Sequence, residues 1–467
     1  MYLTKYLIKS ELDEDHFLMI NTLSGAIDRF HKHALSDLEL IKQGRNPTNK
    51  NFLNKLTERG YVFESKNEED EKFNKLRKTI LDLEDKERPN ITICPTFSCN
   101  MGCGYCYEGE ITSIFKKSLI NPSLIIRSIK KIEEYLKDQG KYCEKPDLTL
   151  IGGEPLLPIV KNDVLEIFKK CASMGYKFSI ITNGYFLDLF IPDFVKNKKS
   201  LKYIQITIDG PKQIHDKRRP LKNLNSTFDK ISENTELALK AGLPIKLRTN
   251  VDLTNIAFLS ELGKYIKSKN WNKYSNFKAY LSPLEDCTVL GIDNVVREDK
   301  LIETWLNEKT DMNNENLSVF DDSQLFSTTD MLESTLLEKK QKVLPRFRYC
   351  GAVKGKMFVL GADGLLYLCV RGIGMPEVSV GRFYPDFQIF NDKIHQWTQR
   401  DIGNINCDSC STVSTMQGGG CALEAIKNTG DLNSCSCDNT EETIMNYVNL
   451  RKKLFIDKFE ESSSSKI

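Results

Sequence analysis

Two hydrophobic patterns alternate between residue 91 and about residue 310. Short runs rich in β-branched and aromatic residues occupy 91–97, 147–153, 177–184, 202–210, 244–252 and 277–283. Amphipathic stretches of helical length separate them, among them 122–138, 162–170, 228–242 and 257–269. This alternation predicts an α/β fold in which parallel strands are joined by crossover helices, as an open sheet or a partial barrel. Ligands in such folds bind at the carboxyl ends of the strands.

The flanking segments have different patterns. Within residues 1–85, the pattern predicts a strand, a turn and a helix over 17–30, and a helix then a strand over 49–64. We expect a small winged-helix-like domain there, followed by a solvated charged helix from residue 64. Residues 311–345 suit a connector that becomes helical at 331–341. Residues 346–440 are rich in cysteine and glycine, and 441–467 are expected to form a closing helix and a disordered tail over 461–467.

Charge and cysteine content narrow the function. The 66 basic residues nearly balance 64 acidic ones, so we expect no nucleic-acid partner. We also expect a cytoplasmic protein without a membrane partner, because no apolar run approaches the length of a span or a signal peptide. The cytosol keeps thiols reduced, so the 14 cysteines favour metal ligation over disulfides. With only five histidines, thiolate-bound zinc or iron–sulfur clusters are favoured.

The first cysteine group is Cys99, Cys103 and Cys106, directly after the first strand of the repeat. Three thiolates on a short loop can hold three irons of a cubane cluster and leave the fourth iron open to a small molecule. A structural zinc site normally has four ligands, and these residues offer no obvious fourth. Zinc or buried thiols remain the alternative, and Cys94 is expected in the core.

This CxxxCxxC loop, with Tyr105 before its last cysteine, resembles that of the radical S-adenosylmethionine (radical SAM) superfamily. The resemblance implies a partial (β/α)6 barrel and a [4Fe-4S] cluster whose open iron binds S-adenosyl-L-methionine. Cleavage of that cofactor would give a 5′-deoxyadenosyl radical, with electrons from a donor such as flavodoxin or ferredoxin. Cys99, Cys103 and Cys106 would then be both the metal ligands and the catalytic residues.

Further motifs support the resemblance. Gly152, Gly153, Glu154 and Pro155 match the GGEP motif, whose carboxylate would bind the methionine ammonium group. The segment 207–220, with Asp-Gly-Pro, His-Asp and Arg-Pro, is similar to one in the subgroup that modifies peptides. The resemblance implies cofactor-binding roles for Tyr105, Gly152, Gly153, Glu154, Pro155, Thr182, Asn183, Thr207, Asp209, Arg248 and Asn250. Taken alone, GGEP and Asp-Gly-Pro are also ordinary turns, and Arg248 would suit a surface ion pair equally well.

The second cysteine group resembles a SPASM domain, which carries up to two auxiliary [4Fe-4S] clusters. The candidate ligands are Cys350, Cys369, Cys407, Cys410, Cys421, Cys435 and Cys437. The match is incomplete, because Met416 replaces one expected cysteine and Cys421 falls one residue late. Spacing does not assign the ligands to clusters, and a zinc ribbon is the alternative.

The resemblance leaves two substrate classes. Anaerobic sulfatase maturases have an aspartate base after the cysteine aligned with Cys369, whereas Val370 and Arg371 stand here. The N-terminal unit resembles a domain that binds the leader of a precursor peptide as an added strand, although a plain winged-helix scaffold fits as well. We therefore expect a maturase of ribosomally synthesised peptides that forms thioether crosslinks. Formylglycine formation, carbon–carbon crosslinking, epimerisation and a non-catalytic zinc-stabilised adaptor are the alternatives.

Overall fold

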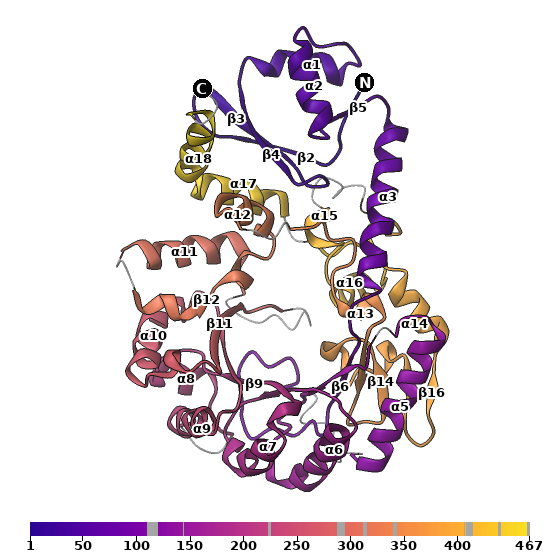
Figure 1. The fold of residues 1–467 in the computed structure, drawn as a ribbon, viewed down its shortest axis with the longest axis vertical. Coiled ribbons are helices and arrows are strands. Elements are labelled where there is room, and N and C mark those ends of the chain that lie inside the picture. Colours follow the sequence, from indigo (N-terminus) through magenta and orange to yellow (C-terminus); the bar gives the residue numbers. More distant parts are fainter. Residues whose placement is uncertain are drawn as a thin grey trace.

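The computed structural model describes residues 1–109, 120–142, 144–222, 226–286, 295–311, 315–339, 343–405, 407, 414–437 and 440–464. Among these residues, no helix is long and apolar enough to cross a membrane. The chain builds a strand–helix barrel, a cysteine-rich region beside it and an N-terminal unit above both (Figure 1).

The barrel confirms the predicted α/β class. Its parallel strands are neighbours in chain order: β6 (Asn90–Ile93), β7 (Asp147–Leu150), β8 (Phe178–Thr182), β9 (Leu201–Thr207), β10 (Ile245–Val251) and β11 (Phe277–Pro283). Each coincides with a run that the hydrophobic pattern singled out, although β6 and β9 begin one residue before their runs. Because the strands are parallel, the segments that follow them gather at one edge of the sheet.

Helices cover the outside of the barrel strands (Figure 1). They are α5 (Pro122–Asp138), α6 (Lys161–Ser173), α7 (Ile191–Lys196), α8 (Lys212–Arg218), α9 (Phe228–Lys240) and α10 (Leu259–Ser268). Helix α5 shows why the sequence pattern predicted these helices. Asn121 caps it by accepting a hydrogen bond from the Leu124 amide, and Pro122 occupies the first turn. Ile125, Ile129 and Ile132 recur at helical spacing and are buried.

The barrel sheet continues beyond the predicted six strands. The connector adds β12 (Phe320–Asp321) to the outer edge of β11. On the other side, β13 (Met357–Leu360) pairs in parallel with β6, and the sheet then runs on antiparallel through β14 (Leu365–Tyr367), β15 (Gly381–Arg382) and β16 (Gln388–Ile389). The cysteine-rich region is therefore joined to the barrel by backbone hydrogen bonds.

Short helices complete the C-terminal half. They are α11 (Glu298–Asp311), α12 (Asp330–Leu336), α13 (Gly351–Lys354), α14 (Asn391–Thr398), α15 (Ser414–Gln417), α16 (Ala422–Thr429), α17 (Thr440–Leu450) and α18 (Lys452–Ser464). The helix predicted at 331–341 in the connector is confirmed as far as Leu336, where α12 ends, and the predicted closing helix is found as two helices, α17 and α18. The tail predicted from residue 461 is wrong as far as Ser464, because α18 continues through it.

The N-terminal unit contains a three-stranded antiparallel sheet and three helices. Its elements are β1 (Tyr2–Leu3), β2 (Leu7–Glu11), β3 (His16–Asn21), β4 (Ala26–His31), α1 (Ala34–Lys42), α2 (Lys50–Glu58), β5 (Val62–Phe63) and α3 (Lys66–Glu84). The sheet order is β2-β3-β4, and β1 pairs with β5.

The helix predicted inside residues 17–30 is wrong, because this segment is the β3–β4 hairpin. The Asn21 carboxamide accepts hydrogen bonds from the amides of Leu23 and Ser24, which closes an Asx turn. Gly25 then takes a φ of +74°, which glycine adopts without strain. The helix–strand prediction for 49–64 and the charged helix after it are confirmed by α2, β5 and α3.

Helix α3 connects the N-terminal unit to the cysteine-rich region (Figure 1). The Arg77 guanidinium donates two hydrogen bonds to the Asp401 carboxylate, at 2.8 and 2.7 Å. The rings of Phe73 and Phe347 pack with centroids 5.3 Å apart. Both contacts reach residues that flank the second cysteine group.

Candidate functional site

The loop with Cys99, Cys103 and Cys106 follows β6 and is held by backbone contacts. The Gly102 amide donates to the Pro220 carbonyl at 2.9 Å, and the Lys222 amide donates to the Asn100 carbonyl at 3.0 Å. This pairing ties the cysteine loop to the segment after α8. The prediction that Cys94 belongs to the core is confirmed, since it is 3% exposed.

The three thiols are partly buried, and this burial favours their neutral form. Burial raises the pKa of Cys99 to about 12, and the nearby Glu154 carboxylate adds to the shift. Burial likewise raises the pKa of Cys106 to about 11, with Glu108 contributing. Burial also raises the pKa of Cys103, although the Arg219 cation opposes it. Metal binding must therefore displace these protons, as thiolate sites generally require.

The donor set suits an iron–sulfur cluster. Three interacting thiols lie on one short, tethered loop, and all three are partly exposed. A cubane cluster takes one thiolate at each of several irons. A single metal ion needs tighter convergence, and within the described ranges no three His, Cys, Asp or Glu side chains are grouped for one ion. The residues therefore fit the predicted [4Fe-4S] cluster.

The GGEP motif packs against the base of this loop. The Gly153 amide donates to the Thr96 carbonyl at 3.0 Å, and the Glu154 amide donates to the Ser98 carbonyl at 2.8 Å. A Cβ atom at Gly153 would lie 2.3 Å from the Ser98 carbonyl oxygen. Gly152 has a φ of +142°, and its Cβ would lie 2.6 Å from the Cys94 sulfur. Two glycines therefore permit this close approach.

The Glu154 carboxylate joins three predicted site residues. It is 1% exposed and accepts hydrogen bonds from the Thr182 hydroxyl at 2.6 Å and the Asn183 amide at 2.7 Å. Burial raises its pKa, while these hydrogen bonds oppose the shift. The Asn183 carboxamide nitrogen in turn donates to Asn100 at 2.8 Å and lies 3.9 Å from the Cys99 sulfur. Pro155 is buried beside them. Binding of the methionine ammonium by Glu154 stays a prediction.

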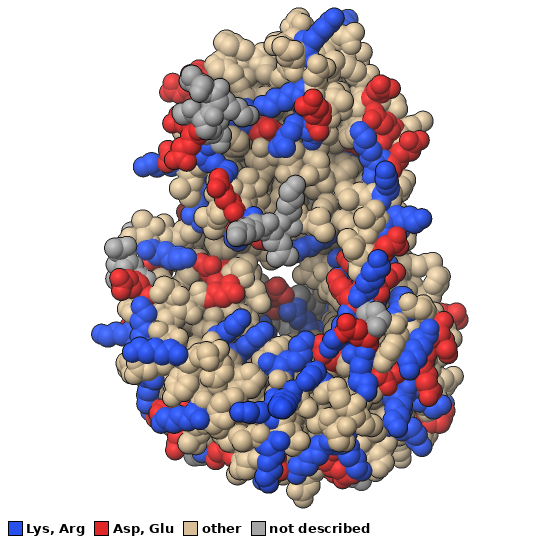
Figure 2. All heavy atoms as spheres, viewed as in Figure 1, with Lys and Arg blue, Asp and Glu red and all other residues tan. Residues whose placement is uncertain are grey.

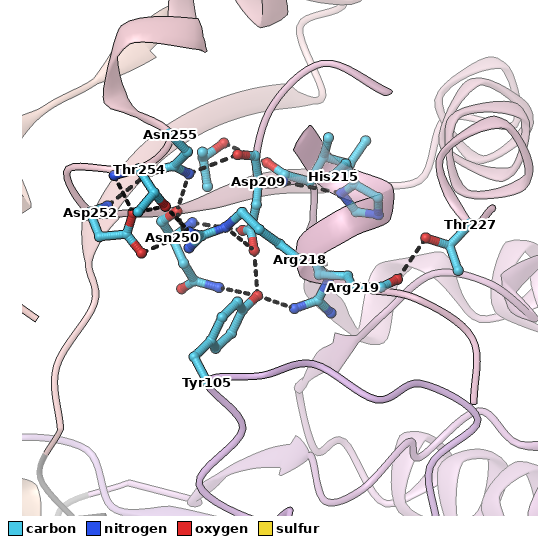
Figure 3. Close-up of polar contacts among 12 residues, drawn as sticks. Tyr105, Asp209, His215, Arg218, Arg219, Thr227, Asn250, Asp252, Thr254 and Asn255 are labelled. Carbon is cyan, nitrogen blue, oxygen red and sulfur yellow. Dashed lines mark hydrogen bonds and ion pairs between the residues drawn. The ribbon is translucent and has the colours of Figure 1, made fainter. Parts of the chain in front are cut away.

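Tyr105 is the centre of a buried polar network (Figure 3). Its hydroxyl donates to the Asp209 carboxylate and accepts from the Arg219 guanidinium. It also accepts from the Asn250 carboxamide at 3.0 Å. The Asn250 amide closes the ring by donating to Asp209 at 3.0 Å. The cysteine loop is thus locked to the carboxyl ends of β9 and β10.

The sequence predicted no site role for Arg219, nor for two further residues of this network, Arg218 and His215. The Arg218 guanidinium lies 5.3 Å from the Tyr105 ring centre and donates to Asp252 at 2.7 Å. The His215 ring is fully buried, and its Nδ1 accepts the Asp209 amide at 3.2 Å. Burial and the Arg219 charge lower the pKa of His215 to about 4. The His-Asp and Arg-Pro motifs marked this segment, but the spacing did not show which side chains would converge.

Two predicted cofactor residues lie apart from the Tyr105 hydroxyl contacts. The Arg248 guanidinium donates to the Ser282 hydroxyl at 3.0 Å, which links β10 to β11. Thr207 is buried at the end of β9, opposite Arg248 in the sheet register. Their predicted contacts with the cofactor stay predictions.

The structure brings part of the second cysteine group together. Cys369 interacts electrostatically with Cys350 and Cys421, and burial raises its pKa to about 12. Arg400, which is 1% exposed, interacts with Cys350, Cys421 and Cys437. Cys350 and Cys421 thus interact both with Cys369 and with Arg400, and Cys437 interacts with Arg400.

Arg400 also fixes the loops that carry these cysteines. Its guanidinium donates to the carbonyls of Gly419 at 2.7 Å and Ser434 at 2.8 Å. Cys407 and Cys435 lie in a disulfide with Cα atoms 6.0 Å apart, where the sequence predicted thiolate ligands. A disulfide and a shared metal cluster both require that the two sulfur atoms lie close together. The role of Cys407 and Cys435 as cluster ligands stays a prediction. Cys410 lies outside the described residues.

A cavity of about 460 Å³ lies between the end of the barrel and the cysteine-rich region. Leu284 and Glu285, which follow β11, line it together with Tyr349, Cys421 and Cys437. The centre of the molecule is hollowed on the face drawn in Figure 2, with acidic and basic side chains around the opening. A substrate held in this cavity would therefore contact the barrel edge and the second cysteine group together.

Comparison with known proteins supports the same interpretation. The radical SAM superfamily model matches residues 93–254, a range that holds the cysteine loop, GGEP and the Tyr105 network. The cysteine-type anaerobic sulfatase-maturating enzyme of Clostridium novyi is 23% identical, over 67% of this chain and 82% of its own length. The serine-type enzyme of Bacteroides thetaiotaomicron is 28% identical over 31% of this chain and 35% of its own.

Two solved structures share the fold. The structure described as native anSMEcpe with bound AdoMet has a TM-score of 0.57 at 18% identity, covering 79% of this chain and 99% of its own. Streptococcus suis SuiB bound to S-adenosylmethionine has a TM-score of 0.51 at 12% identity, covering 94% and 99%. The superfamily uses a [4Fe-4S] cluster and S-adenosylmethionine, for which this chain has the expected cysteine loop. On their motifs, their geometry and the superfamily match, residues 93–254 are identified as a radical SAM domain.

Proposed function

We propose that this protein matures a ribosomally synthesised precursor peptide by forming thioether crosslinks from a cysteine sulfur to a carbon atom. The observation that carries the proposal is the cavity between the end of β11 and the second cysteine group. Its volume lies within the usual range of small-ligand sites, so it can hold a few peptide side chains.

The first cysteine loop would supply the radical. Cys99, Cys103 and Cys106 would hold the [4Fe-4S] cluster, which when loaded delivers the electron that splits S-adenosylmethionine. The chain itself would contribute by holding the cysteine loop in a fixed position. The Tyr105 network and the Gly153 contact fix the loop against β7, β9 and β10, so the reacting centre is preorganised. The auxiliary clusters would be held by the second cysteine group. Cys350 and Cys421 interact with Cys369 and with Arg400, and Arg400 also interacts with Cys437, which favours these four cysteines as one set of ligands.

The N-terminal unit would bind the leader of the precursor. In its sheet, β4 is an outer strand that no described strand pairs on its far side, whereas β2, the other outer strand, packs against α17. A peptide can add to such an edge through main-chain hydrogen bonds. Strand β4 is therefore the proposed leader site.

Anaerobic reconstitution with a cysteine-containing precursor peptide tests the proposal. The expected product is lighter by two hydrogen atoms for each crosslink and accompanies 5′-deoxyadenosine. Replacing Cys99, Cys103 and Cys106 with alanine should abolish 5′-deoxyadenosine formation. Cys171→Ala is the matched control, because Cys171 is buried in the α6 core away from both groups. An unchanged peptide mass alongside active cofactor cleavage would refute thioether formation.

Formylglycine formation is the second candidate, because the sulfatase-maturating enzymes match much of this chain. The two reactions give different products from the same cysteine. A formylglycine aldehyde reacts with a hydrazide probe, whereas a thioether does not. Carbon–carbon crosslinking and epimerisation would both leave a free thiol, which an alkylating reagent detects.

A further inference from the structure

Thioether formation needs more than a radical. Joining a thiol sulfur to a carbon removes one hydrogen atom from carbon, one proton from sulfur and one electron. The 5′-deoxyadenosyl radical takes the hydrogen atom. The proton needs a base within hydrogen-bond reach, and the electron needs an acceptor. The sequence places no carboxylate beside Cys369, so the base must come from another part of the chain.

The structure brings such a carboxylate to the cavity. Glu285 lies two residues beyond the end of β11 and lines the cavity that Cys421 and Cys437 also line. Its Oε2 accepts a hydrogen bond of 2.8 Å from the Arg371 guanidinium. Arg371 stands two residues after Cys369, and its charge acts on the thiols of Cys369 and Cys350. The ion pair thus links the barrel edge to the second cysteine group at the cavity wall.

We propose that Glu285 is the catalytic base that accepts the thiol proton of the peptide, and that Arg371 positions it. This inference rests on the proposed thioether chemistry. The steps balance: Glu285 takes the proton from sulfur, and the carbon–hydrogen bond breaks to the 5′-deoxyadenosyl radical. The carbon radical and the thiolate then form the carbon–sulfur bond. The remaining electron passes to an oxidised auxiliary [4Fe-4S] cluster.

Two other acidic residues at the cavity, Glu298 and Glu424, are engaged in structural contacts. Glu298 accepts the Thr328 amide at 2.8 Å and the Ser327 hydroxyl at 2.9 Å, which holds the start of α12. Glu424 accepts the Ser436 hydroxyl at 2.7 Å. The Glu285 side chain is 45% exposed, and a carboxylate has two oxygens that can together accept several hydrogen bonds. Glu285 can therefore reach a substrate and keep its orientation.

The test measures crosslinked peptide, 5′-deoxyadenosine and peptide affinity separately in the reconstituted holoenzyme. Glu285→Gln should lower crosslinking by about 10²- to 10³-fold, because it keeps an acceptor for Arg371 but cannot take a proton. Formation of 5′-deoxyadenosine and the peptide Kd should stay near wild type. Glu166→Gln is the matched control, since Glu166 also pairs with a cation, Lys170, but lies on the exposed side of α6 and does not line the cavity, and it should retain crosslinking.

Arg371 is tested by graded replacement. Arg371→Lys should keep more crosslinking than Arg371→Gln, with kcat affected and KM for the peptide unchanged, as expected of a positioning residue. Wild-type crosslinking in Glu285→Gln would overturn the inference. Equal loss of crosslinking and 5′-deoxyadenosine would also overturn it, because it would indicate a structural role. Failure of the proposed function is distinct, since wild-type enzyme would then cleave its cofactor and form no thioether.

Discussion

Gly153→Ala should push the GGEP motif away from the segment 96–98 that leads into the cysteine loop. The added Cβ would lie 2.3 and 2.4 Å from the carbonyl oxygens of Ser98 and Phe97, whereas ordinary contacts start near 3.4 Å. Both neighbours are backbone, so the two segments must part by about 1 Å. That movement lengthens the hydrogen bonds from Gly153 to Thr96 and from Glu154 to Ser98, now 3.0 and 2.8 Å, to about 4 Å, beyond hydrogen-bonding range.

The cost follows from these contacts. Two lost hydrogen bonds destabilise the junction by about 1 kcal/mol each, and overpacking adds about 1–3 kcal/mol. We therefore expect a local loss of about 3–5 kcal/mol, comparable to a large share of the stability of a typical domain. The free energy of local opening is set by the contacts that close the loop. Because the substitution removes these contacts, we expect the cysteine loop to be open in most molecules.

The assay is iron and sulfide content after anaerobic reconstitution, with 5′-deoxyadenosine as the second readout. Gly104→Ala is the matched control, because Gly104 lies in the same loop and a Cβ there meets nothing within 4 Å. It should load and react like wild type. Gly153→Ala should load less iron, in proportion to one lost cluster. Full iron loading together with wild-type cofactor cleavage in Gly153→Ala would refute the packing argument.

Three further changes probe the buried networks. Tyr105→Phe removes the hydroxyl that accepts a hydrogen bond from the Arg219 guanidinium. The cluster-loaded cysteine loop should be destabilised by about 1–3 kcal/mol, and a chelator should remove the cluster faster than from wild type. The folded protein keeps His215 neutral down to about pH 4, against 6.5 for a free histidine, so only the unfolded chain gains this proton between those values. Unfolding free energy should therefore fall by up to about 3 kcal/mol from pH 6.5 to 4, a slope that His215→Gln should lack. Arg400→Met should remove the hydrogen bonds that hold the loop beside Cys421. The protein should then bind less iron at the second cysteine group and still load the cluster of the first group, which spectroscopy of each cluster can measure.

The sequence predicted the elements that local pattern controls. The runs over 177–184 and 244–252 are strands, and 122–138 is a helix with the predicted bounds, because β-branched composition and helical periodicity coincide with burial there. Ala26, Ile27 and Phe30 misled this reasoning, since their spacing fits a helix. The Asx turn at Asn21 instead folds them back as a strand.

The site was predictable where chemistry lies within one motif. Cys99, Cys103 and Cys106 share a loop, and GGEP stands against it as expected. Contacts between side chains from distant segments could not be predicted from the sequence. Tyr105 and Asp209 are 104 residues apart and Glu285 and Arg371 are 86 apart, and no spacing rule links them before the barrel closes.

The added strand β13 determines how the two cysteine groups can move. It pairs with β6 along its whole length, and β6 leads directly into the first cysteine loop. A ladder of backbone hydrogen bonds therefore sets the spacing between the barrel and the start of the cysteine-rich region. The N-terminal unit is attached differently, through side chains: Arg77 pairs with Asp401, and buried residues such as Ile8 and Ile20 belong to the same hydrophobic core as the barrel. A substitution in this side-chain packing would therefore displace the N-terminal unit and leave intact the backbone ladder that joins the two cysteine groups.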